Sequence, residues 1–70
     1  MSLTARTYIA KNVKEYRVKK GIKREELSLI LGVDNSYISK LERERINIPI
    51  DKLEKIANYF EIDIIELLKH

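Results

Sequence analysis

A short stretch of the chain carries polar side chains that suit hydrogen bonding rather than covalent chemistry. Residues 35–43 present an amide, two small hydroxyls, an ammonium and a guanidinium, contributed by Asn35, Ser36, Ser39, Lys40 and Arg43. Amides and hydroxyls donate and accept hydrogen bonds, and cationic groups donate charge-assisted ones. This set differs from the mixture of Glu and Lys on an ordinary solvated helix. It indicates a surface that binds a polar partner, and a plain polar helix surface is the alternative.

The groups that most covalent and metal chemistry needs are missing from the sequence. The 70 residues include no Cys, which removes disulfides, thiolate zinc sites and Cys nucleophiles. The one His is His70, the last residue, where a chain usually frays. Glu25 and Glu26 are neighbours that do not face each other on a helix, so an acid–base pair is not expected. We therefore predict a protein that is not an enzyme and has no catalytic residue, metal or cofactor.

Basic residues gather in the first third of the chain. Residues 1–24 contain eight Lys and Arg and one Glu, a net charge of +7, whereas residues 25–70 contain six basic and ten acidic residues, a net charge of −4. A positive third beside an acidic remainder favours a polyanionic partner such as nucleic acid. A solvated, Lys-rich helix face is the alternative.

Length and composition limit the architecture and the location. Seventy residues suit one domain, so we treat residues 1–70 as a single unit. The sequence is 44% hydrophobic and 36% charged, a balance typical of a folded domain. No apolar run reaches the roughly 18–20 residues that span a bilayer, and the first residues lack the pattern of a secretion signal. We predict a cytoplasmic protein with no membrane partner, which the lack of Cys also favours.

Apolar residues recur at helical spacing in five short segments. The helices are expected over about residues 4–20, 24–31, 35–43, 49–60 and 64–69. Gly21 and Gly32 are placed to end the first two helices, and Asp34 and Asp63 suit the N-caps of the third and the last. The predicted fold class is therefore all-α, a compact bundle of about five short helices.

Two features of the chain indicate where function lies. The turn at residues 32–34 is about three residues long, as in a helix-turn-helix, so we assign residues 24–43 to that motif. Residues 50–69 are assigned to packing and dimerisation. Five of the seven residues from 62 to 68 are apolar. We expect Ile62, Ile64 and Leu67 to face the core, while Ile65 and Leu68 face a partner chain.

The middle of the chain resembles the phage repressor and Cro type of helix-turn-helix protein. The resemblance rests on GIKREELS at 21–28 and GVDNSYISKLER at 32–43, and it extends from about Ile9 to Leu68. The continuation NIPIDKLEKIA at 47–57 looks most like the small controller proteins of restriction–modification systems. The resemblance implies a lambda-repressor-like five-helix domain. It also implies a homodimeric transcriptional regulator that binds a partly palindromic, double-stranded DNA operator.

The same resemblance implies roles for individual residues. The positions that read base edges correspond to Asn35, Ser36, Ser39 and Lys40, of which Ser39 is alternatively a small residue that lets helices approach. The positions that contact the DNA backbone correspond to Lys23, Arg24, Tyr37, Arg43 and Arg45. Arg17 and Glu42 correspond to an internal ion pair. The chemistry fits, because Asn binds the adenine edge with two hydrogen bonds and Lys reaches guanine acceptors.

Several residues depart from the pattern of the family. The family usually has Gln in place of Arg24, Ala in place of Ser28 and Gly in place of Glu44, and the sequence offers no reason for Glu44. Lys23 stands where an N-cap belongs, and its ammonium cannot accept a hydrogen bond, at a cost of about 1 kcal/mol. Our hypothesis is that Lys23 and Arg24 together hold a phosphate. The alternative is a Lys side chain extended into water.

A protein-interaction module is the rival to a DNA-binding regulator. The same fold could serve as an antirepressor, an antitoxin or an adaptor whose third helix meets protein. The basic first third beside a small polar face favours nucleic acid. RNA polymerase is a further candidate partner of a regulator.

Overall fold

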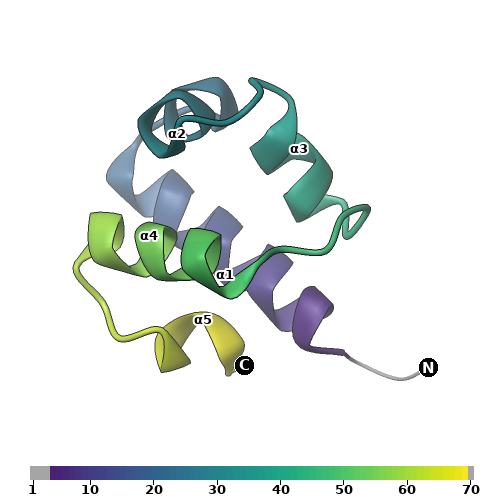
Figure 1. The fold of residues 1–70 in the computed structure, drawn as a ribbon. Helices are drawn as coiled ribbons and strands as arrows, with labels where there is room; N and C mark the ends of the chain where they lie inside the picture. The colour runs from purple at the N-terminus through teal and green to yellow at the C-terminus, as the bar shows by residue number, and fades with distance from the viewer. Residues whose placement is uncertain (1–3, 70) are drawn as a thin grey trace.

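Five helices form the part of the chain, residues 4–69, that the computed structural model describes (Figure 1). They are α1 (Ala5–Lys20), α2 (Arg24–Leu31), α3 (Tyr37–Glu42), α4 (Ile50–Phe60) and α5 (Ile65–Leu68). The described residues contain no strand, so the predicted all-α class is confirmed. None of their helices is long and apolar enough to cross a membrane. The expectation about His70 lies outside the described residues.

Local signals set the ends of the helices. The Thr4 hydroxyl accepts the N–H of Thr7 at 3.4 Å and caps α1. Gly21 and Gly32 end α1 and α2 with φ of 74° and 70°, the left-handed region that glycine enters without a steric penalty. The end of α4 is less usual, because Glu61 adopts the same region with φ of 58°.

The core lies where all five helices meet. Its fully buried apolar side chains are Val13, Leu27, Ile38, Leu53, Ile56 and Leu67. On α2, Leu27 and Leu31 point inward and are buried. Leu29 and Ile30 are 80% and 49% exposed, because the inward stripe of an eight-residue helix has no room for four large side chains.

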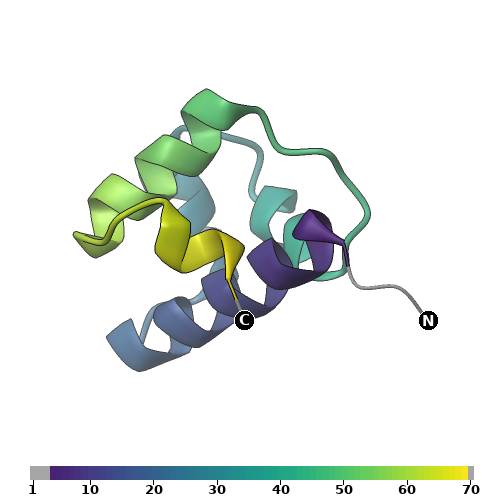
Figure 2. The ribbon, with the colours of Figure 1, turned by 90° about the horizontal axis from the view of Figure 1, so that it is seen from below.

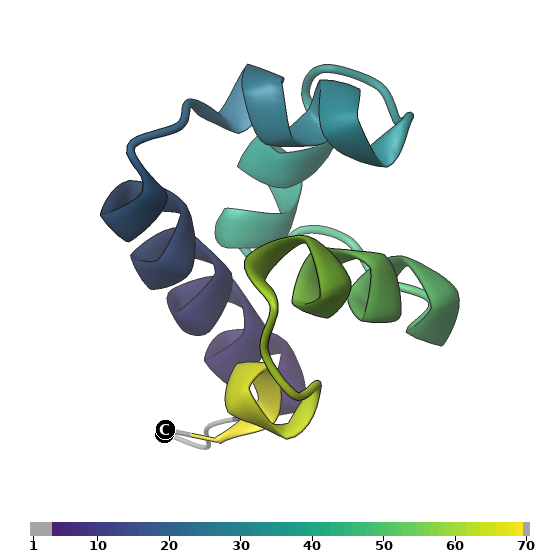
Figure 3. The ribbon, with the colours of Figure 1, turned by 90° about the vertical axis from the view of Figure 1, so that its left-hand side faces the viewer.

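The helices are arranged so that α2 and α5 lie at opposite ends of the molecule (Figures 1 and 3). The long helix α1 packs against both α3 and α5. Seen from below, α5 lies across the space between α1 and α4 (Figure 2). The α2–α3 unit and the C-terminal helix therefore occupy different surfaces, connected through α1.

Candidate nucleic-acid interface

Asp34 holds the turn that leads into α3. Its carboxylate accepts the N–H of Ser36 at 3.2 Å and also the Ser36 hydroxyl, and its carbonyl accepts the N–H of Tyr37 at 2.9 Å. The hydrogen bonds from the Ser36 hydroxyl and N–H lower the pKa of Asp34 below its usual value. The prediction that the helix follows Asp34 directly is wrong. The carboxylate closes a turn first, and α3 begins at Tyr37.

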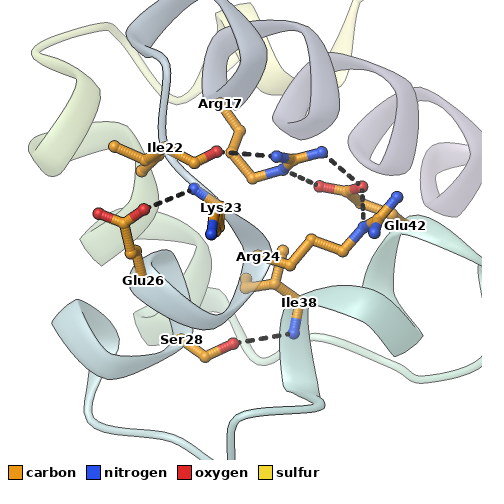
Figure 4. A network of polar contacts seen from close by, with 8 residues as sticks. All are labelled: Arg17, Ile22, Lys23, Arg24, Glu26, Ser28, Ile38 and Glu42. Atoms are coloured by element: carbon orange, nitrogen blue, oxygen red, sulfur yellow. Dashed lines mark hydrogen bonds and ion pairs between the residues drawn. The ribbon is translucent and has the colours of Figure 1, made fainter.

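A buried hydroxyl on α2 fixes the start of α3. Ser28 is 0% exposed, and its Oγ accepts the N–H of Ile38 at 3.3 Å (Figure 4). N–H groups in the first turn of a helix have no partner within that helix, so Ser28 supplies a cap from the neighbouring helix. From the sequence, Ser28 was noted only because the family usually has Ala at this position. The signal that could have indicated this contact was a hydroxyl directly after the core residue Leu27.

The four side chains expected to read bases lie on one short stretch. Asn35 and Ser36 are in the turn, and Ser39 and Lys40 are on α3. Asn35 and Lys40 are exposed, whereas the two serines are half-buried. The Ser36 hydroxyl donates to Asp34, so it offers a partner an acceptor oxygen rather than a donor. Asn35 and Lys40 are therefore the most accessible members of the set.

Glu42, the last residue of α3, joins three helices (Figure 4). Its Oε2 accepts Arg17 Nε at 2.8 Å, and its Oε1 accepts Arg17 Nη2 at 3.3 Å and Arg24 Nε at 3.1 Å. Arg17 Nη1 also donates to the carbonyl of Ile22 at 2.8 Å. The side chains of Arg17 and Glu42 are 10% and 5% exposed. The ion pair expected from the resemblance is present, and the contact with Arg24 is an addition to it.

Arg24 occupies the first position of α2 and is anchored by only part of its guanidinium. Its side chain is 49% exposed, and its Nε donates a hydrogen bond to Glu42. The two Nη groups make no further hydrogen bond within the described residues. Paired N–H groups of a guanidinium match the oxygens of a phosphate. Glu42 therefore orients Arg24 while leaving its anion-binding edge available.

Lys23 precedes α2 with an extended backbone and an exposed side chain. Its N–H donates to Glu26 Oε1 at 3.0 Å (Figure 4). Because an ammonium has no acceptor, the α2 terminus receives only the Glu26 half of a capping box. Lys23 stands beside Arg24 at the positive end of the helix. The hypothesis of a shared phosphate contact stays a prediction.

The loop after α3 carries Arg43 and Arg45, both exposed, on either side of Glu44. Glu44 adopts φ of 61°, which explains why the family favours Gly at this position. Its carboxylate accepts the Thr7 hydroxyl at 2.8 Å. That hydrogen bond draws the Glu44 charge toward the start of α1 and fixes the loop that presents the two arginines.

Tyr37 does not present its hydroxyl to the surface. The oxygen is buried and has no hydrogen-bond partner among residues 4–69. Burial, and secondarily the charge of Asp51, raises the pKa of Tyr37. The expectation that this hydroxyl contacts the DNA backbone does not fit this geometry, because the ring packs against the core and carries the hydroxyl with it.

Two cations in the basic first third of the chain have partners within the chain. Arg17 is held in the buried pair with Glu42. The Lys20 ammonium lies over the Tyr59 ring, 4.6 Å from its centroid. Lys23 and Arg24 remain at the start of α2. The net charge of that third therefore overstates the number of cations that remain available to a partner.

The C-terminal helix divides into inward and outward faces as predicted. Leu67 is 0% exposed, whereas Ile65 is 59% and Leu68 is 38% exposed. Ile62 and Ile64 are half-buried and pack against the core. An apolar pair on such a short helix is an exposed surface that a partner chain can cover.

Two helices joined by a tight turn, with a polar face on the second and cations around it, define a helix-turn-helix domain. The chain belongs to the helix-turn-helix family, because residues 13–67 match the model of a family described as "Helix-turn-helix". The resemblance to repressor-type proteins inferred from residues 21–43 is thereby confirmed.

Comparisons with known proteins agree with this assignment. The chain is 38% identical over 63 residues to "Neisseria hypothetical transcription factor" from Neisseria meningitidis serogroup B, a match covering 90% of this chain and 59% of that relative. The chain thus spans about three fifths of the length of this curated relative.

Solved structures show the same architecture. The crystal structure of the hypothetical transcription factor from Neisseria has a TM-score of 0.89 at 36% identity, covering 94% of this chain and 76% of that one. A nucleoprotein complex of C.Esp1396I has a TM-score of 0.76 at 30% identity, covering 99% of this chain and 100% of that one. C.Esp1396I is a restriction–modification controller protein.

Proposed function

We propose that this chain is a transcriptional regulator that binds a specific double-stranded DNA sequence as a homodimer. The observation that carries the proposal is the exposed polar stretch at residues 35–40, held in place by Ser28 and Glu42. In this arrangement α3 enters the major groove, and Asn35 and Lys40 reach the base edges. Ser36 offers an acceptor oxygen to a base, and the Ser39 hydroxyl adjusts to either kind of base.

The surrounding cations supply affinity without sequence preference. Lys23, Arg24, Arg43 and Arg45 are exposed at the ends of α2 and α3 and contact phosphates. Each phosphate neutralised releases counterions, so binding weakens steeply as salt rises. We assign the chain no catalytic step.

Dimerisation places two α3 helices on one duplex. Ile65 and Leu68 form the contact between copies, and the two half-sites lie about 34 Å apart. The similarity to C.Esp1396I supports a controller of a restriction–modification system as the narrower function. We place this activity in the cytoplasm, with RNA polymerase as a further partner.

Selection of bound duplexes from a random pool tests the proposal. The expected result is one enriched, partly palindromic site whose half-sites are about one helical turn apart. Failure to enrich any sequence contradicts sequence-specific binding. Passage through both heparin and DNA columns in moderate salt favours the protein-interaction module instead.

A further inference from the structure

The helix α5 cannot hold its own position. It has four residues, and a helix that short is marginal without outside contacts. At its start, Asp63 Oδ1 accepts the N–H of Ile65 at 3.1 Å. On the inward side, Leu67 is buried in the core. The carbonyl groups at its other end have no partner within the helix.

Asn12 of α1 supplies that missing partner. Its side chain lies in the interior, with the residue 8% exposed. The Nδ2 group donates to the carbonyl of Leu67 at 3.0 Å and also to the carbonyl of Lys69. One amide group thus uses both of its hydrogens to cap the C-terminal end of α5. No role was predicted for Asn12.

We propose that Asn12 is the positioning residue for dimerisation, because it fixes α5 so that a second copy of this chain docks on Ile65 and Leu68. The inference rests on the proposed homodimer. Without the amide, the carbonyls of Leu67 and Lys69 turn toward water and the outward pair loses its fixed spacing.

The surface around this pair suits a second copy. Glu66 and Lys69 flank it and form an ion pair at 3.1 Å. In a two-fold dimer the interface is self-complementary, so Lys69 of each copy can pair with Glu66 of the other. The location of α5, at the end opposite α2, leaves the α2–α3 surface free for DNA (Figures 1 and 3).

The test compares Asn12→Leu with a matched control, Ser28→Ala. Asn12→Leu removes the two hydrogen bonds to the end of α5, whereas Ser28→Ala removes one buried hydrogen bond that acts on α3 and not on α5. Sedimentation equilibrium is run on the full chain at a temperature where circular dichroism shows every variant folded. We expect Asn12→Leu to raise the dimer dissociation constant roughly tenfold and Ser28→Ala to leave it within about twofold. If Asn12→Leu does not fold, Asn12→Ser enters the same comparison.

A third variant, Ile65→Ser, separates this inference from the proposed dimer. If Ile65→Ser weakens the dimer but the Asn12 variant does not, the positioning role is wrong and the interface stands. If Ile65→Ser leaves the dimer intact, the interface is wrong and the inference falls with it. Two copies of Asn12→Leu joined by a flexible linker are expected to bind the operator as tightly as two joined parent copies. A large deficit in the joined variant contradicts a role that acts through dimerisation.

Discussion

Glu42 Oε1 accepts a hydrogen bond from Arg24 Nε at 3.1 Å, so the last residue of α3 holds the first residue of α2. Arg17 neutralises the same carboxylate from α1. The guanidinium that we propose meets phosphate is thereby tied to the end of the helix that we propose meets bases. The spacing of these two proposed DNA contacts is set by the buried Glu42 carboxylate rather than by a flexible side chain.

Replacing Arg24 tests its contact with phosphate. Arg24→Ala is expected to weaken binding to operator and to unrelated duplex by the same factor, and to reduce the salt slope by about 1. The free energy of unfolding is expected to change by less than about 1 kcal/mol, because the side chain is 49% exposed. Arg24→Lys keeps the charge but lacks the forked geometry, so it restores only part of the affinity. DNA titrations over a salt series measure both quantities, and an altered base preference contradicts the assignment.

We expect Lys23 to raise DNA affinity and to lower the free energy of unfolding. Lys23→Ser places a hydroxyl where the N–H groups of α2 need an acceptor, so we expect a gain of about 1 kcal/mol in the free energy of unfolding. DNA affinity is expected to fall because one phosphate contact is lost. Urea unfolding and a titration at low salt measure the two effects. Unchanged DNA affinity at low salt contradicts a phosphate contact by Lys23.

Two glutamates in left-handed backbone allow a matched comparison. Glu61 has φ of 58° at the end of α4, and Glu61→Gly is expected to raise the free energy of unfolding by about 0.5–1 kcal/mol. Glu44→Gly relieves the same strain but loses the hydrogen bond from Thr7, so its gain is smaller. Thr7→Val removes that hydrogen bond alone. Equal gains from both glycine variants contradict any stabilising role for the Thr7 contact.

The buried hydroxyl of Tyr37 predicts a pH dependence. Burial raises its pKa above the usual 10.0, so the folded chain favours the neutral phenol. Stability due to this group is complete below about pH 10 and is lost as the pH rises through the folded pKa. Tyr37→Phe is expected to lose less stability in that alkaline range, and to stay within about 1 kcal/mol of the parent at neutral pH.

The same variant tests the corrected role of Tyr37. DNA affinity is expected to be unchanged, since the hydroxyl lies inside. A tenfold loss of affinity in a DNA titration contradicts this expectation and supports a contact between the Tyr37 hydroxyl and the DNA backbone.

The sequence predicted the helices well because their signals are local. Gly21 and Gly32 end helices through their own backbone freedom, and the spacing of Ile9 and Val13 depends only on helix geometry. The pairing of Arg17 with Glu42 came instead from the resemblance, since residues 25 positions apart carry no local signal.

The contacts that the sequence did not predict share a different cause. Asn12 and Ser28 donate or accept across helices, and the side chain at each position could as well have faced water. Asp34 was recognised as a cap, but its carboxylate bonds to Ser36 and delays α3. Such contacts depend on how helices pack, which spacing along one helix does not record.

Reading of DNA bases by the polar side chains of Asn35, Ser36, Ser39 and Lys40 is the proposal on which the others depend. The most direct measurement is the ratio of affinities for the selected operator and for a scrambled duplex, in a variant with Asn35, Ser36 and Lys40 all changed to alanine. Circular dichroism verifies that the variant is folded. We expect the ratio to fall by at least about tenfold, because each good base contact contributes roughly 1–3 kcal/mol of discrimination. A folded variant that keeps the parent's ratio contradicts the account.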